Sequence, residues 1–219
     1  ADPDASTADS ITALMYAVDG GALPVAKLLL GAGADPGKGA SWQEAPLITA
    51  VRKADLLMLG LLLDAGAQTD IRDAAGMTAL MHSSRLNDVL IAWILIKEGA
   101  RIEAADADSC RAVHHAAANG SYEALAFLLD TGAIADVRDI SGITPAMLVA
   151  ARGDIAMLEL LMEHGADPMT RDRNGLNYLD HAILHHQDGV VAFVLDIGHP
   201  DSGSRESASG IGMPYVQDE

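Results

Sequence analysis

Apolar and polar positions along this chain repeat with a period of 33 residues. The strongest marker is a run of three apolar residues at a constant place in the period. Its six copies are Leu28-Leu29-Leu30, Leu61-Leu62-Leu63, Ile94-Leu95-Ile96, Phe127-Leu128-Leu129, Leu160-Leu161-Met162 and Phe193-Val194-Leu195. Three adjacent apolar residues spread over much of a helix circumference. We therefore expect each run to lie in a helix that is covered on two sides.

One period predicts a turn followed by two helices. Between residues 73 and 105, the turn is Asp73-Ala74-Ala75-Gly76, the first helix spans Met77 to Arg85, and the second spans Asp88 to Glu98. Glycine tolerates the positive φ of such a turn and of a helix end, which suits Gly76 and Gly99. A unit this short cannot bury its own apolar side, so it must stack on its neighbours. The sequence thus predicts one elongated, all-α array.

Composition and charge restrict the classes of function that the chain could have. Half of the 219 residues are apolar but only 4% are aromatic, so the core should be aliphatic. The chain has 14 Lys and Arg against 31 Asp and Glu, a net charge of -17, which disfavours nucleic acid and anionic membranes as partners. No apolar run reaches the ~18 residues of a membrane span. We expect a soluble protein, and the start at Ala1 with the single Cys110 leaves its compartment open, cytoplasmic or exported with the signal removed.

Two segments show the local motif of the period most fully: Asp139-Ile140-Ser141-Gly142-Ile143-Thr144-Pro145 and Leu160-Leu161-Met162-Glu163-His164-Gly165-Ala166-Asp167. They resemble the ankyrin repeat, whose pattern is D-x-x-G-x-T-P-L-H-x-A-A followed by L-L-x-x-G-A-D. The resemblance covers about residues 7 to 199. It implies a solenoid of helix-turn-helix units with projecting β-turn fingers, used mainly to bind other proteins. We expect a polar lead-in over 1–9, six repeats within 10–199 (about 7–39, 40–72, 73–105, 106–138, 139–171 and 172–199) and a flexible tail over 200–219.

The same resemblance implies a concave binding face made of the fingers and the exposed positions of the first helices. In this acidic chain, that face would carry the basic residues Arg52, Lys53, Arg85 and Arg152. A local reversal of charge favours an acidic partner surface. The alternative is that these are ordinary cations at helix ends, where they meet the helix dipole.

Trp42 stands at a predicted finger tip, where it would either anchor a partner or lie across a neighbouring finger. The other residues predicted to contact a partner are Glu44, Met77, Leu86, Cys110, Asn119 and His185. The recurring pairs Arg72-Asp73, Arg138-Asp139 and Arg171-Asp172 are expected to link neighbouring fingers instead.

A metal-dependent hydrolase is the competing hypothesis, with Cys110, His114 and His115, or His181 and His185, as ligands. Zinc needs ligand atoms within ~2.1 Å of one ion, whereas equal positions in adjacent repeats lie ~10 Å apart. The resemblance implies that His114 closes hydrogen bonds between turns. We therefore expect no cofactor and no catalysis, but a monomeric module that binds a folded protein with an acidic patch, as an inhibitor, an antidote or a scaffold.

Overall fold

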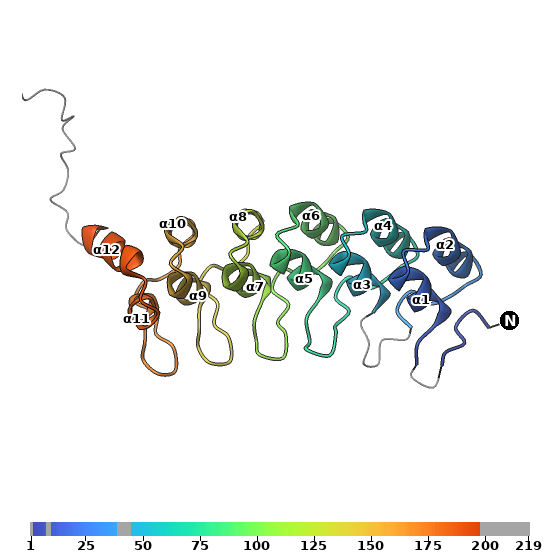
Figure 1. The fold of residues 1–219 in the computed structure, drawn as a ribbon, viewed down its shortest axis with the longest axis horizontal. Helices are drawn as coiled ribbons and strands as arrows, with labels where there is room; N and C mark the ends of the chain where they lie inside the picture. The colour runs from blue at the N-terminus through green and yellow to red at the C-terminus, as the bar shows by residue number, and fades with distance from the viewer. Residues whose placement is uncertain (1, 8–9, 39–44, 198–219) are drawn as a thin grey trace, which may run out of the picture.

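The computed structural model describes residues 2–7, 10–38 and 45–197. It shows an elongated array of helix pairs in three rows: one row of second helices, one of first helices, and one of fingers (Figure 1). The first helices are α1 (Ala13–Asp19), α3 (Pro46–Arg52), α5 (Ala79–Arg85), α7 (Ala112–Asn119), α9 (Pro145–Arg152) and α11 (Tyr178–Leu184). The second helices are α2 (Leu23–Gly31), α4 (Leu56–Asp64), α6 (Val89–Lys97), α8 (Tyr122–Asp130), α10 (Ile155–Glu163) and α12 (Asp188–Ile197).

These helices carry the 33-residue period into space, because the six first helices begin 33 residues apart. Their boundaries follow from capping. Thr12 accepts the Met15 amide at the start of α1 (3.3 Å), and Asp88 accepts the Ile91 amide at the start of α6 (3.0 Å). In the third repeat, α5 begins at Ala79, two residues later than the sequence predicts, because Thr78 is the extended residue before the helix.

The core lies where the apolar runs of the second helices meet the first helices. The central residue of each run is buried in repeats two to five: Leu62, Leu95, Leu128 and Leu161. Small or apolar residues of the first helices, such as Ala50 and Ala116, are buried with them. In the first repeat, the central Leu29 is only partly buried and Leu28, the first residue of the run, is 75% exposed, which differs from the expected cover on two sides. No described repeat lies beyond α2 to cover it.

The fingers are tight turns joined edge to edge by backbone hydrogen bonds. Ala107 donates its amide to the Ala75 carbonyl (3.1 Å), Ile140 to Asp108 (2.8 Å) and Arg173 to Ser141 (3.0 Å). Gly76 shows why a glycine is needed in the turn: its φ is +78°, and an added Cβ would lie 2.8 Å from the Ala107 amide nitrogen. The fingers of repeats three to six are thus one connected edge.

The two ends of the chain differ in what the structure describes. In the lead-in, Asp4 accepts the Asp35 amide (2.9 Å) and pairs with Lys38 (3.9 Å), so it is tied to the first repeat. The tail predicted over 200–219 lies outside the described residues. Within the described ranges, no helix is long and apolar enough to cross a membrane.

Candidate functional site

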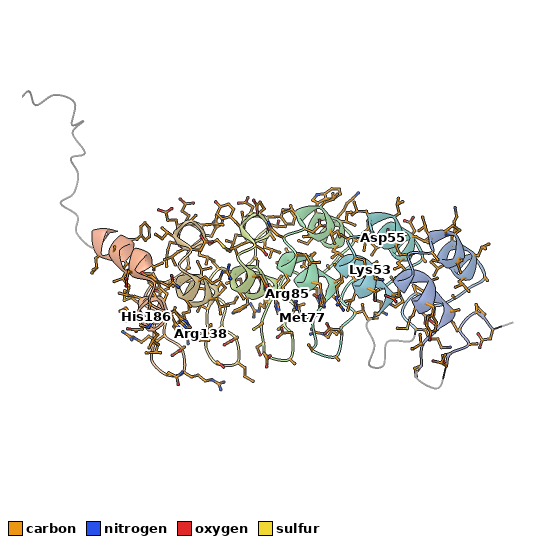
Figure 2. All side chains as sticks on the ribbon, viewed as in Figure 1. Lys53, Asp55, Met77, Arg85, Arg138 and His186 are labelled. Carbon is orange, nitrogen blue, oxygen red and sulfur yellow. The ribbon has the colours of Figure 1, made fainter. Side chains whose placement is uncertain are left out.

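The candidate site is the row of residues at the carboxyl ends of the first helices, together with the fingers. Each first helix is followed by a residue with positive φ, which turns the chain back into the second helix. These residues are Gly21, Ala54, Asn87, Gly120, Gly153 and His186. Because this turn is the same in every repeat, the one or two residues before it recur in line along the array. Figure 2 shows Lys53 and Arg85 near the first helices of successive repeats.

Two of the predicted basic residues bind the preceding repeat. The Lys53 ammonium pairs with the Asp19 carboxylate (2.6 Å) and donates to the Asp19 carbonyl, while Arg152 donates to the Ala118 carbonyl (3.1 Å). Gln187 repeats this contact with Ala151 (3.2 Å). A cation at a helix carboxyl end satisfies carbonyls and meets the negative end of the dipole. For Lys53 and Arg152, this placement favours the structural alternative raised from the sequence.

The position of the Arg152 side chain also explains why residue 120 is a glycine. An added Cβ on Gly120 would lie 2.3 Å from the Arg152 guanidinium, so the arginine reaches α7 through the space that Gly120 leaves. The side chain therefore belongs to the joint between repeats four and five.

Arg85 and Leu86 form the exposed centre of the row. Leu86 is 51% exposed at the end of α5, and the neighbouring Arg85 side chain is exposed. Within the described residues, the Arg85 guanidinium donates no hydrogen bond and pairs with no carboxylate, although its charge contributes to lowering the pKa of His115. Arg52 occupies the equivalent position one repeat earlier and is also exposed. An exposed cation beside an apolar side chain is a feature of binding surfaces.

The remaining predicted contact residues lie in different surroundings. Asn119 and His185 are exposed on the row, and Asn119 donates to the His115 carbonyl (2.9 Å). Met77 is only 7% exposed, which favours packing at the finger base over contact with a partner. Trp42 and Glu44 lie outside the described residues.

Cys110 is half-buried at the base of the fourth finger. Its amide donates to Asp106 Oδ1 (2.9 Å). Burial, with Asp106, Asp139 and Asp108 nearby, raises the pKa of the Cys110 thiol to about 12. The sulfur is therefore a neutral thiol at neutral pH, which disfavours nucleophilic attack.

The recurring histidines bind their own fingers. His82 Nε2 donates to Asp73 Oδ2 (2.8 Å), and His115 Nε2 donates to Asp106 Oδ2 (2.8 Å). The same contact joins His181 to Asp172 (3.1 Å) in repeat six. The other carboxylate oxygen of each aspartate accepts two amides of the turn, as when Asp106 Oδ1 binds Asp108 and Cys110. Each aspartate thus clamps its finger to its first helix.

The pKa values of Asp73 and His115 are shifted within their clamps. Burial raises the pKa of Asp73, but hydrogen bonds from His82 and the turn amides outweigh it, and the net pKa is lowered. For His115, burial lowers the pKa more than the hydrogen bond to Asp106 raises it. The lowered pKa of Asp73 favours its anion at neutral pH, and the lowered pKa of His115 favours its neutral imidazole.

His114 links two repeats. Its Nδ1 accepts the Arg111 amide (3.1 Å), and its Nε2 donates to the Ile143 carbonyl in the next finger (3.2 Å), as the resemblance implies. Burial is the main cause that lowers its pKa. Both ring nitrogens of His114 therefore have hydrogen-bond partners, and so does Nε2 of His115 and of His181. Over the ranges that the structure describes, no group of three His, Cys, Asp or Glu side chains is placed to hold a metal ion.

The expected links from arginine to the neighbouring finger hold in part. Arg72 donates to the Gly76 carbonyl of its own finger (2.8 Å) and to the Ala105 carbonyl of the next repeat. Arg171 donates to the Gly175 carbonyl in the finger that directly follows it (2.5 Å) and lies 3.7 Å from Asp180. Neighbouring fingers are joined chiefly by backbone bonds, which side-chain patterns do not reveal.

The clamps are the feature that sequence reasoning missed. The signal was present, because an aspartate precedes a histidine by nine residues at 73 and 82, at 106 and 115, and at 172 and 181. The recurring aspartates and the recurring histidines each form a periodic pattern, and the constant spacing between the two patterns is what predicts the clamps. Repeat five lacks the pair, since Leu148 stands nine residues after Asp139.

Comparison with known proteins agrees with this architecture. A family profile described as "Ankyrin repeats (3 copies)" matches residues 14–106, 47–140 and 113–203, which together cover most of the chain. The curated proteins contain no significant match to the sequence.

Proposed function

The chain belongs to the ankyrin-repeat family, and from that premise we propose that it grips an acidic surface of a folded protein through its first-helix row. Ankyrin repeats are generally protein-protein interaction modules and typically have no catalytic activity. The proposal adds where the partner binds and what charge it carries. The proposed contact residues centre on Arg52, Arg85 and Leu86, flanked by Asn119 and His185.

One observation carries the proposal: exposed arginines and an apolar side chain are grouped on adjacent repeats of a chain whose net charge is -17. Arg85 differs from Lys53 and Arg152, which bind carbonyls of the preceding helix. A guanidinium beside an exposed leucine suits a partner carboxylate with apolar surroundings. Such a grip serves an inhibitor or antidote that covers an enzyme, and equally a scaffold.

The rigid joints between repeats support binding of a folded partner. The backbone hydrogen bonds between fingers, the aspartate–histidine clamps and His114 hold the first-helix row in a fixed geometry before any partner binds. A preorganised surface loses little conformational entropy on binding. A row of six repeats is ~60 Å long at ~10 Å per helix, which is ample for an interface of ~800 Å² per partner.

The test is capture of proteins from source cells by immobilised wild-type chain and by Arg85→Glu, followed by mass spectrometry. We expect the specific partner to bind the variant about tenfold more weakly, since the reversed charge repels its acidic patch. The melting temperature should stay nearly unchanged, because the Arg85 side chain is exposed and its guanidinium donates no hydrogen bond within the described residues.

The matched control adds the same two negative charges on the second helices, as Ala156→Glu with Ala192→Glu, both at exposed alanines. It should capture the partner as the wild type does. Equal loss in both variants would reduce the effect to net charge, and equal capture by Arg85→Glu at low salt would remove the row from the proposal.

A further inference from the structure

The second helices of repeats two and three present apolar side chains to solvent. Leu57 on α4 is 71% exposed, and on α6 Leu90 is 52% and Trp93 48% exposed. The fold does not require apolar residues at these places. One period after Leu90, the same exposed position holds Glu123, and two periods after Trp93 it holds Glu159.

The exposed apolar surface is large for a monomer. With the half-covered Leu56 and Tyr122 beside them, these side chains leave on the order of 500 Å² of apolar surface, near the top of the range for monomeric proteins. A standard interface covers ~800 Å² per partner, and about two-thirds of a homodimer interface is apolar. The patch therefore has the area that one side of a stable dimer needs.

A hollow lies beside this patch, between α2 and α4. It is lined by Leu23, Lys27, Leu56, Leu57, Gly60, Leu61 and Asp64. Gly60 stands at the position that Trp93 occupies one period later, and an added Cβ there would meet no atom within 4 Å. The hollow is thus lined mainly by leucines, with open space at Gly60 and the Lys27 side chain in its lining. An aromatic ring fits such a site, because it gains apolar contacts and a cation over its face.

We propose that the occupant is a second copy of this chain, which inserts Trp93 into the hollow between α2 and α4. Figure 1 places α2, α4 and α6 side by side in one row. Trp93 stands on α6 at the place in the period that Gly60 holds in the lining of the hollow, so the ring and the hollow belong to neighbouring elements. A two-fold axis close to α4 brings each Trp93 over the hollow of the other copy. It also brings the two α4 helices together, so the most exposed leucine of the patch becomes covered.

This arrangement satisfies the requirement of a two-fold interface, in which one surface must be complementary to itself. Lys27 of each copy then lies beside the incoming indole, whose other face keeps Lys97 (5.2 Å from the ring centroid). From the sequence we expect a monomer, and the exposed patch is the reason for departing from that expectation. The first-helix row lies on other elements, so the inference does not depend on the proposed function.

The test is the mass of the purified full chain by sedimentation equilibrium, from about 1 µM to about 500 µM, which spans weak to tight dimers. We expect the wild type to approach twice its chain mass of 22.8 kDa. Trp93→Glu should weaken the dimer by about 30-fold or more, as for loss of a buried aromatic anchor. Gly60→Trp should weaken it likewise, because the new ring fills the hollow of the same chain.

Both variants should keep the monomer fold. Glutamate already stands at the Trp93 position in repeat five, and Gly60 has open space for a side chain. Circular dichroism and thermal melting at low concentration check this. The matched control, Ala156→Glu, places a charge on α10 outside the patch and should leave the dimer intact. A wild type of single-chain mass throughout, or a dimer that survives both Trp93→Glu and Gly60→Trp, would overturn the inference.

The dependence of binding on salt concentration distinguishes this interface from the first-helix row. Screening of the -17 charge on each copy should strengthen self-association as salt rises, whereas it should weaken capture of an acidic partner. A dimer that dissociates as salt rises would be held by ion pairs and would contradict the apolar interface.

Discussion

The two sides of this solenoid are held together by different forces. On the finger side, buried carboxylates and histidines make directional bonds, as Asp106 does with two amides and His115. On the second-helix side, stability comes from leucines such as Leu62 and Leu128 that are fully buried between helices. Directional bonds fix the position of a surface, while apolar burial supplies most of the free energy of folding. The finger side is accordingly suited to present a binding row, and the apolar side to stabilise each helix pair, while successive repeats pack on one another mainly through their first helices.

The largest expected effect on stability comes from a cavity among the buried leucines of the second helices. Leu62→Ala on α4 should lower the free energy of unfolding by about 2–5 kcal/mol, because it leaves a cavity among fully buried neighbours. Leu57→Ala on the same helix removes the same atoms from a side chain that is 71% exposed. It should cost less than about 1 kcal/mol. Urea unfolding at low protein concentration compares the two, and equal losses would contradict the division of the helix into a buried and an exposed side.

A smaller effect is expected when a finger clamp is removed. Asp106→Ala deprives two turn amides and His115 of their acceptor, which should cost about 1–3 kcal/mol. Asp108→Ala, two residues away, is the control, because its exposed carboxylate accepts no hydrogen bond within the described residues. Amide hydrogen exchange in the fourth finger should accelerate in the first variant only. A stable finger in Asp106→Ala would show that the backbone ladder alone positions it.

The smallest effect is a dependence on pH that arises on the finger side. Burial lowers the pKa of His114 and of His115, so the unfolded chain binds protons more readily than the folded chain. Their contribution to stability is full above about pH 6.5 and declines as the pH falls below it. We expect the melting temperature to decrease from pH 7.5 to 5.5. The raised pKa of His164, caused first by the Leu160 carbonyl, acts in the opposite direction, but that side chain is exposed.

His114→Met tests the assignment. Methionine already occupies the equivalent position in repeats three and five, where the Met81 and Met147 sulfur atoms accept the amide before the helix (3.4 Å in both). The variant should therefore fold and lose part of the slope with pH. A slope that does not change would assign the acid sensitivity to other groups.

The helices were predictable because their causes are local and repeated. Gly99, as expected, has a positive φ at the end of α6, and the turn at Gly76 lies where the pattern places it. The candidate site was less predictable. The sequence placed Lys53, Arg85 and Arg152 in one row, but it could not distinguish an arginine that binds a backbone carbonyl from one that remains exposed. Lys53 and Arg152, which bind carbonyls, stand one residue later in the 33-residue period than Arg85 does.

The sequence by itself determined the period, the paired helices and the family, because glycines, caps and apolar runs act within a few residues and recur six times. Only the tertiary structure decided which polar groups meet and which apolar side chains stay uncovered. The hydrogen bond from His114 to the Ile143 carbonyl of the next finger and the exposure of Trp93 both depend on neighbouring helices and turns in space. Contacts of that kind arise from the stacking of each repeat on its neighbours.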